Sequence, residues 1–293
     1  MRSIILLSAI LINSAIKLKS QNDTLYLMKD GFIINKHSIK PIDLDSIKFN
    51  GTDTMLFLKN DIIINKQSIN IDSIIFYQPT IADSGFFSDT RDSNTYKWIK
   101  IGNQIWMAEN LRYLPSVVGP DMGSLSTPYY YVYGYYGTAV NVAITQPNYT
   151  TYGVLYNWTA AMDGAISSNS NPSGVQGVCP VGWHLPSDAE WTELTTYIGG
   201  ESIAGGKLKE TGTAHWNSPN TAATNETRFT ALPGGYRYNN NTFYYINKYG
   251  LWWSTSESSS SNSYYRTMYY NYSNIYKSDE KKDLALSVRC IKD

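Results

Sequence analysis

Side chains that could perform catalysis are few in this chain of 293 residues. It has three histidines, His37, His184 and His215, and two cysteines, Cys179 and Cys290. No second histidine or carboxylate is placed by the sequence to complete a catalytic triad, and no Gly-rich phosphate loop precedes a helix. We interpret His184, which stands just before a predicted helix, as a packing or capping residue. The sequence therefore predicts a protein that is not an enzyme.

The two cysteines have two alternative states. An exported protein meets oxidising conditions, so an even cysteine count favours a disulfide, and two buried free thiols are the alternative. Structural zinc is held by four ligands that usually stand in close pairs. Two isolated cysteines with no nearby histidine pair do not provide such a set, so we expect no metal and no cofactor here.

Tyrosine is the most distinctive residue of the composition. The chain has 25 tyrosines and 8 tryptophans, while charged residues make up only 16%, and tyrosines crowd residues 129–136 and 264–272. Rigid amphipathic rings beside Ser, Gly and Asn supply contact area at a low entropy cost, and they can stack on sugars. The residues expected to contact a ligand are Tyr130, Tyr131, Tyr133, Tyr265, Tyr269 and Trp216. The alternative is that alternate tyrosines only cover a sheet.

The charge balance excludes one class of partner. Lys and Arg together number 24, as do Asp and Glu, so the formal net charge is zero. Binding to nucleic-acid phosphates requires a basic surplus or a basic patch, and the sequence shows neither. We therefore expect a glycan or a surface protein as the partner, and no nucleic acid.

The N-terminus is typical of an export signal. Arg2 supplies a positive charge, residues 4–16 form an almost unbroken apolar run, and Ser20 is a small residue suited to cleavage before Gln21. The run is shorter than the roughly 20 apolar residues of a spanning helix, although an uncleaved anchor is the alternative. We predict a signal peptide over residues 1–20, a secreted or cell-surface location, and no membrane span after cleavage.

A two-copy repeat follows the predicted signal. The copies begin with the similar segments 23–29 and 53–59, and each closes with Asp-Ser-Ile, at 45–47 and 72–74. Short β-branched runs separated by Lys-Asp-Gly or Lys-Asn-Asp predict hairpins. Because one copy is too small to bury a core alone, we predict a small all-β repeat module over residues 21–78.

The rest of the chain has the pattern of one α+β domain, residues 96–293, which a polar linker at residues 79–95 precedes. Its clearest element is a helix that begins with a Ser-x-x-Glu capping box, in which Ser187 and Glu190 each accept the other's backbone amide. We expect this helix to end at two glycines, residues 199–200, since glycine accepts a left-handed conformation. The other expected elements are a hairpin at 97–107, a helix at 153–162, strands at 251–254 and 264–272, a charged turn at 277–283 and a last strand at 284–291.

Several short segments of this domain form an ordered set. The most specific is Cys-Pro-Val-Gly-Trp-His-Leu-Pro at residues 179–186. The others are Ile-Trp-Met-Ala-Glu-Asn-Leu at 105–111, Tyr-Gly-Val-Leu-Tyr-Asn-Trp at 152–158, Leu-Pro-Gly-Gly at 232–235, Leu-Trp-Trp-Ser-Thr-Ser at 251–256 and Ser-Val-Arg-Cys at 287–290. Together they resemble the Fibrobacter succinogenes major paralogous domain, a family of exported bacterial proteins, over residues 96–293.

That family in turn is similar to the formylglycine-generating and C-type lectin-like folds. The resemblance implies a C-type lectin-like domain with two helices on twisted antiparallel sheets, and a disulfide between Cys179 and Cys290. The formylglycine-generating enzymes use a copper-binding cysteine pair near the C-terminus, where this chain has one cysteine. C-type lectins hold calcium through two triplets, which Gln146-Pro147-Asn148 and Trp216-Asn217-Ser218 match only in part. We therefore expect no cofactor, with calcium as the alternative.

These observations together predict an exported bacterial binding or adhesion protein. It would recognise a glycan or protein ligand through the loops and Tyr-rich strands of residues 96–293. Two alternatives stay open, an enzyme related to the formylglycine-generating group and a purely structural surface protein.

Overall fold

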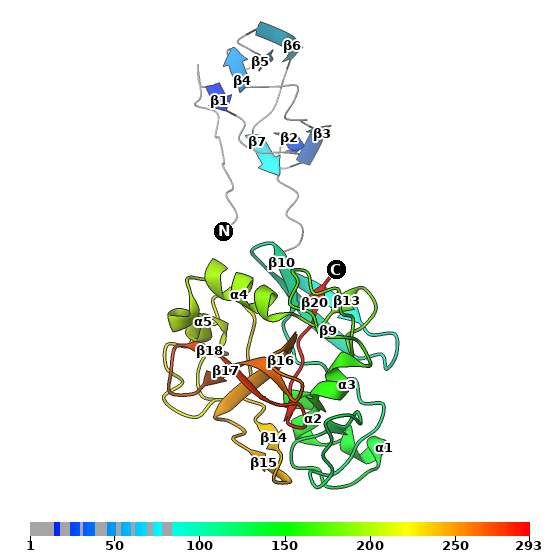
Figure 1. Cartoon of the computed structure of the whole chain (residues 1–293). Coiled ribbons are helices and arrows are strands. Elements are labelled where there is room, and N and C mark those ends of the chain that lie inside the picture. The colour runs from blue at the N-terminus through cyan, green and yellow to red at the C-terminus, as the bar shows by residue number, and fades with distance from the viewer. Residues whose placement is uncertain are drawn as a thin grey trace. The chain divides into compact units, whose positions relative to one another are not determined.

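The computed structural model describes residues 84–293 in full and, before them, the backbone of seven strands. The chain divides into two compact units, Met1–Ala82 and Asp83–Asp293. Labels from β1 to β20 and from α1 to α5 follow the chain in Figure 1.

The described strands of the first unit form two sheets, ordered β1-β4-β5-β6 and β3-β2-β7. They are β1 (Ala15–Lys17), β2 (Thr24–Lys29), β3 (Phe32–Ser38), β4 (Ser46–Asn50), β5 (Thr54–Lys59), β6 (Ile62–Ser68) and β7 (Ser73–Tyr77). Each repeat copy forms one hairpin, β2–β3 or β5–β6. The third strand of each copy pairs with the hairpin of the other, β4 with β5 and β7 with β2, so the copies exchange strands. Strand β1 lies within the stretch predicted as the signal peptide.

The second unit is α+β. It holds two five-stranded sheets, ordered β13-β20-β10-β9-β8 and β11-β12-β19-β14-β15, and a three-stranded sheet, β16-β17-β18. Its strands are β8 (Ser84–Ser88), β9 (Thr95–Ile101), β10 (Gln104–Met107), β11 (Tyr130–Tyr131), β12 (Leu155–Asn157), β13 (Trp183–His184), β14 (Tyr236–Tyr238), β15 (Thr242–Tyr244), β16 (Tyr249–Glu257), β17 (Asn262–Tyr269), β18 (Ile275–Lys281), β19 (Ala285–Leu286) and β20 (Ile291–Lys292). Its helices are α1 (Val140–Ala143), α2 (Pro147–Tyr152), α3 (Trp158–Met162), α4 (Asp188–Tyr197) and α5 (Glu201–Leu208). None of these described helices is long and apolar enough to cross a bilayer.

Helix α4 begins and ends where local side-chain chemistry fixes it. The Ser187 hydroxyl accepts the amide of Glu190 at 3.1 Å, and the Glu190 carboxylate accepts the amide of Ser187 at 2.9 Å, so both halves of the capping box are present. Beyond the last turn, Gly199 and Gly200 have φ angles of 109° and 97°, which favour glycine because a Cβ would clash there. The chain can therefore turn sharply into α5.

Helices α4 and α5 pack on the three-stranded sheet (Figure 1). Trp191 of α4 and Leu208 of α5 share one buried cluster with Trp252 of β16 and Met268 of β17. Burying a large apolar side chain contributes about 1.5–3 kcal/mol, so this cluster holds helices and sheet together. The approach is close enough that a Cβ built on Gly205 would overlap the carbonyl of Asn274.

The Cys179–Cys290 disulfide that the resemblance implies is present, with Cα atoms 6.0 Å apart. Both cysteines are fully buried. The bond joins the segment before β13 to the segment before β20, and the Cys290 carbonyl accepts the amide of Met107 at 2.9 Å. It therefore fastens the end of the chain to the centre of a five-stranded sheet.

The expected helix at residues 153–162 is only half correct. Residues Leu155–Asn157 form β12, which pairs with β11 and β19, and only Trp158–Met162 is helical. The helix begins there because the Asn157 side chain accepts the amide of Ala160 at 3.0 Å and caps it. Pairing with distant strands thus overrides the helical spacing of the segment.

Other elements of the structure also differ from those that the sequence predicts. The structure has five helices in its described part rather than two, and α5 lies in a segment for which no element is predicted. Most of the charged stretch 277–283 belongs to β18, which pairs with β17, and the predicted last strand is replaced by two short strands, β19 and β20. Strand β8 lies in the predicted linker, yet it pairs with β9, and its Phe87 stacks on Trp183 at 4.3 Å.

Replacing both cysteines with serine, Cys179→Ser together with Cys290→Ser, should lower the free energy of unfolding. The two residues are 111 positions apart, and closing a loop of that length stabilises a fold by about 4–5 kcal/mol in chain-entropy terms. Urea unfolding of the full chain gives the measurement, and reduced wild type should match the double variant. Equal stability of the oxidised wild type and the double variant would contradict the prediction.

Candidate binding surface

Three of the six residues expected to contact a ligand lie in the core, which corrects that expectation. Tyr130, Tyr131 and Trp216 are 9%, 0% and 1% exposed. The Tyr131 hydroxyl donates to the carbonyl of Met122 at 2.7 Å, and the Trp216 indole donates to the carbonyl of Ala231 at 2.9 Å. Because their rings and polar atoms are used inside the protein, these residues are removed from the candidate surface.

The other three residues, Tyr133, Tyr265 and Tyr269, are half-buried. Tyr133 packs on Phe243 with ring centroids 5.0 Å apart. Tyr265 lies directly opposite Trp253 in the β16–β17 ladder, and their centroids are 6.1 Å apart. Tyr269 differs from these two, because its aromatic neighbours Tyr249, Tyr272 and Tyr276 are tyrosines that are themselves partly exposed.

Tyr269 belongs to a group of eight mutually contacting tyrosines, none of them buried, that we call the tyrosine face. Its members are Tyr236, Tyr238, Tyr244, Tyr245, Tyr249, Tyr269, Tyr272 and Tyr276. Neighbouring rings have centroids 4.4–6.3 Å apart. Tyr245 and Tyr272 are the most open, at 42% and 49% exposed. The tyrosine face is therefore continuous and reachable from solvent.

Strand register builds the tyrosine face. Tyr236 of β14 stands directly opposite Tyr244 of β15, and Tyr249 of β16 directly opposite Tyr269 of β17. Tyr245 joins the two pairs, because its ring lies 4.4 Å from that of Tyr249 and 6.0 Å from that of Tyr236. Since side chains alternate along a strand, the intervening residues of β16 and β17 turn toward α4 and α5. The tyrosine face is thus the uncovered margin of a sheet whose other side is buried.

Three phenols of the tyrosine face are shifted toward their neutral form. Burial raises the pKa of Tyr236, Tyr249 and Tyr269, and neighbouring tyrosines act in the same direction. A neutral phenol both donates and accepts a hydrogen bond. The tyrosine face therefore offers flat apolar rings with polar edges.

A buried lysine holds one end of the tyrosine face. Lys209 is 0% exposed, and its Nζ donates to the carbonyls of Thr221, Tyr269 and Tyr272 at 3.0, 3.1 and 2.8 Å. Burial lowers the pKa of Lys209 to about 8, and the ammonium lies 5.4 Å from the ring centre of Trp216. This single cation fixes the turn between β17 and β18, which carries Tyr272.

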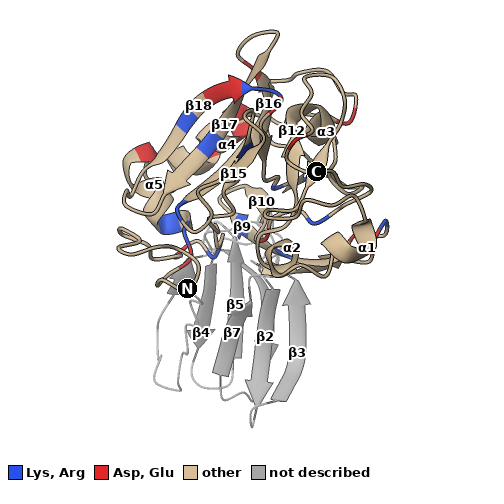
Figure 2. Ribbon diagram, turned by 90° about the horizontal axis from the view of Figure 1, so that it is seen from below, with Lys and Arg blue, Asp and Glu red and all other residues tan. Residues whose placement is uncertain are grey.

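Charged residues are sparse and of mixed sign along the chain of the second unit, as the colouring in Figure 2 shows. The main network joins helices to sheet, because Asp188 of α4 lies 2.7 Å from both Arg266 of β17 and Lys277 of β18. Arg266 also lies 2.6 Å from Glu201 of α5. These ion pairs anchor the covered side of the three-stranded sheet, opposite the tyrosine face.

His184 lies between two carboxylates and is 4% exposed. Its Nε2 is 2.7 Å from Glu190 and its Nδ1 is 2.7 Å from Asp293, while Glu190 also accepts the amides of Ser187 and Ser173. Burial opposes a charge on the imidazole, but the hydrogen bonds and charges of both carboxylates outweigh it and raise the pKa of His184. An imidazolium that donates from both nitrogens has no lone pair for metal binding or proton abstraction. The group therefore clamps α4 to the last residue of the sequence.

The two lectin-like triplets are used for packing. The Asn148 side chain donates to the carbonyl of Tyr133 at 3.0 Å, and Trp216 is in the core. Within residues 84–293, no group of three or more His, Cys, Asp or Glu side chains is arranged to hold a metal ion.

Five members of the tyrosine face come from residues 236–249, none of which is among the residues expected to contact a ligand. They are Tyr236, Tyr238, Tyr244, Tyr245 and Tyr249. The sequence does hold a signal for part of the tyrosine face, since Tyr-Arg-Tyr and Phe-Tyr-Tyr stand on either side of an Asn-rich turn. Alternate residues of hairpin strands share a face, so tyrosines in these two strands can lie side by side. Their contact with Tyr269 depends on a second sheet, for which the segment holds no signal.

Lys209→Met should lower the free energy of unfolding by about 2–4 kcal/mol, because three partly buried carbonyls lose their donor and an unsatisfied buried group costs about 1–3 kcal/mol. The turn at residues 270–274 should also exchange its amide hydrogens faster. Lys248→Met is the matched control, since Lys248 is exposed and should change stability by less than about 0.5 kcal/mol. Equal effects of the two variants would refute the role given to Lys209.

The His184 clamp should make stability depend on pH. Because its folded pKa is raised, its contribution is complete below the unfolded pKa of about 6.5 and is lost as pH rises through the folded value. His184→Gln carries no charge, so the difference in unfolding free energy between wild type and variant should shrink between about pH 6 and about pH 8. Urea unfolding at each pH measures this difference. A difference that stays constant with pH would show that His184 is not charged in the fold.

Comparison with known families gives one match. The sequence model of the Fibrobacter succinogenes major domain matches residues 99–292, from within β9 to the end of β20. No curated protein and no solved structure matches the chain. The matched span includes the whole tyrosine face, Lys209, His184 and both cysteines.

Proposed function

The chain belongs to the Fibrobacter succinogenes major domain family, and from that premise we propose that it is an exported binding protein that recognises a glycan through its tyrosine face. The observation that carries the proposal is the continuous contact of eight partly exposed tyrosine rings across two sheets. Tyr rings bury a large area at low entropy cost and keep a polar tip. Sugar rings have C–H faces that stack on such rings and hydroxyls that pair with phenols.

The chemistry of the tyrosine face favours a glycan over a protein. Interfaces between proteins usually pair aromatic anchors with Arg and with a polar rim around a deep pocket. The tyrosine face instead repeats one residue type along a margin of two sheets, so it offers many similar stacking positions. That arrangement suits a ligand made of repeated sugar units.

We propose that the protein is not an enzyme of the formylglycine-generating type. Those enzymes use a cysteine pair near the C-terminus, and the chain has only two cysteines. Cys290 is bonded to Cys179, which leaves no thiol for that chemistry. The expected absence of calcium and of other cofactors belongs to the same proposal.

The finer fold and the location are also part of the proposal. A C-type lectin-like arrangement is supported by α4 and α5 on an antiparallel sheet and by a disulfide that ties the last strand to the helical region. Secretion to the cell surface is supported by the apolar run at residues 4–16 and by the disulfide, which persists in oxidising compartments.

Tyr245→Ala and Tyr272→Ala should each weaken glycan binding about 10-fold, since each removes an exposed ring and a central aromatic contact is worth more than 1 kcal/mol. A glycan array with the full chain identifies the ligand, and calorimetry measures the variants. Tyr197→Ala is the matched control, because Tyr197 is 66% exposed and lies outside the tyrosine face. Unchanged affinity of both face variants, binding only to proteins on a parallel array, or turnover of the ligand would each overturn the proposal.

A further inference from the structure

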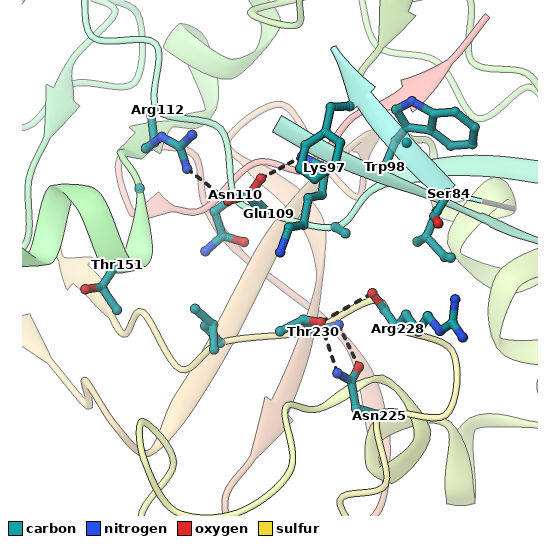
Figure 3. Close-up of a pocket in the computed structure, with 16 residues that line it drawn as sticks. Ser84, Lys97, Trp98, Glu109, Asn110, Arg112, Thr151, Asn225, Arg228 and Thr230 are labelled. Atoms are coloured by element: carbon teal, nitrogen blue, oxygen red, sulfur yellow. Dashed lines mark hydrogen bonds and ion pairs between the residues drawn. The ribbon is translucent and has the colours of Figure 1, made fainter. Parts of the chain in front are cut away.

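A pocket of about 540 Å³ lies among strands β8 and β9, the segment that follows β10, the end of α2 and the loop at residues 225–232. Its volume is within the range of about 300–1,000 Å³ that is usual for small-molecule sites. Figure 3 shows Lys97, Glu109 and Arg112 on one side of the pocket and the loop that carries Asn225 and Arg228 on the other. None of these residues belongs to the tyrosine face.

The lining of the pocket has a surplus of positive charge, although the formal net charge of the chain is zero. It holds three cations, Lys97, Arg112 and Arg228, and one carboxylate, Glu109. That carboxylate is engaged, because it accepts from Arg112 at 3.4 Å and from the amide of Lys97 at 2.6 Å. Among the ion pairs within residues 84–293, none involves the Lys97 ammonium or the Arg228 guanidinium.

A buried guanidinium adds to this charge from behind the lining. Arg289 is 1% exposed and donates to the side chain of Asn110 at 2.9 Å and to the carbonyl of Thr230 at 2.8 Å, two residues of the pocket wall. It also donates to the carbonyl of Phe229. These partners are neutral. Burial lowers the pKa of Arg289 to about 9, although the charge of Glu109 acts in the opposite direction, so a further anion nearby would stabilise its charged form.

The loop that presents Arg228 is held in an uncommon conformation. Asn225, Arg228 and Thr230 have φ angles of 47°, 59° and 53°, in the left-handed region that non-glycine residues seldom occupy. The Asn225 side chain accepts the amide of Thr230 at 2.9 Å and donates to its hydroxyl at 3.0 Å, which closes the loop on itself. Residues held this way concentrate at ligand-binding sites, and here they form one wall of a cationic pocket.

Two aromatic side chains complete the lining. Phe86 of β8 is 66% exposed, and Trp98 of β9 lies against β8 where Gly85 leaves room for its ring. A Cβ at Gly85 would lie 2.7 Å from that ring, so glycine is needed for the approach. The pocket therefore combines unpaired cations with an apolar surface suited to the face of a sugar ring.

We propose that this pocket binds an anionic sugar residue, through a carboxylate or sulfate group that pairs with Lys97 and Arg228 while the ring lies against Phe86. Both groups are planar or trigonal arrays of oxygen acceptors that lysine and arginine recognise. The site is separate from the tyrosine face and does not depend on the function proposed for it.

The test is calorimetric titration of the full chain with three disaccharides of similar size, a digalacturonate, a sulfated disaccharide and neutral lactose. At least one anionic disaccharide should bind while lactose does not, and raising the salt from about 0.05 M to about 0.5 M should weaken binding by screening exposed charges. Arg228→Gln and Lys97→Gln should each weaken it about 10-fold, the effect of one lost charge-assisted hydrogen bond. Lys281→Gln, at an exposed lysine of β18, is the matched control and should bind as wild type does.

The comparison of the two anions identifies the group that is bound. Stronger binding of the digalacturonate assigns the pocket to a uronic acid, and stronger binding of the sulfated disaccharide assigns it to a sugar sulfate. The proposal would be overturned if lactose bound equally well, if neither anionic disaccharide bound at about 10 mM, or if both pocket variants kept the affinity of the wild type. Tyr245→Ala should leave anion binding unchanged, so failure at this pocket and failure at the tyrosine face are distinguishable.

Discussion

The last nine residues of the sequence take part in all three sheets of the second unit, and the remaining structure of that unit depends on them. Strand β19 lies between β12 and β14, and β20 lies between β13 and β10. Between them, Ser287 bonds to both Leu251 and Trp253 of β16, through its amide at 3.1 Å and its carbonyl at 3.2 Å. The disulfide at Cys290 and the contact of Asp293 with His184 then hold this segment in place. Because this short segment is bonded to all three sheets, it fixes their positions relative to one another.

That arrangement explains why the tyrosine face is open. One side of the β16–β18 sheet packs on α4 and α5 through Trp252, and the other side enters the main core through Leu251 and Trp253. Tyr249 packs against the edge of the main core, and no described element covers the rings of Tyr249 and Tyr269 completely. Purely apolar residues here would expose a large hydrophobic patch. Phenols bury each other's ring faces and present hydroxyls to water, so tyrosine is the residue type that this open margin tolerates.

Features decided by a few neighbouring residues can be predicted from the sequence, and features decided by distant contacts cannot. The capping box of Ser187 and Glu190 is specified within four residues, and it is present. Tyr131 and Tyr272 are the same residue type, yet they are 0% and 49% exposed, because burial depends on which strands lie next to each other. Helix α5 is not predicted from the sequence because it contains glycines, which have low helix propensity. Its tertiary position requires Gly205, since a side chain there would overlap the carbonyl of Asn274.

Two buried cations of the second unit differ in their partners. One is paired with carboxylates and stabilises the fold, and the other lies behind the pocket to which we assign anion binding. Arg266 pairs with Asp188 and Glu201, so its charge is balanced inside the protein and links helices to sheet. Arg289 has only neutral hydrogen-bond partners, and it lies behind a pocket with two further unpaired cations. The charge of Glu109 raises the pKa of Arg289, but burial outweighs it and lowers that pKa, so the buried charge is only partly compensated. An anion bound in the pocket would add a second counter-charge, and a ligand that binds only the folded state stabilises it more the more tightly it binds. The charge imbalance that weakens the fold is thus also the source of the affinity that we propose for an anionic sugar.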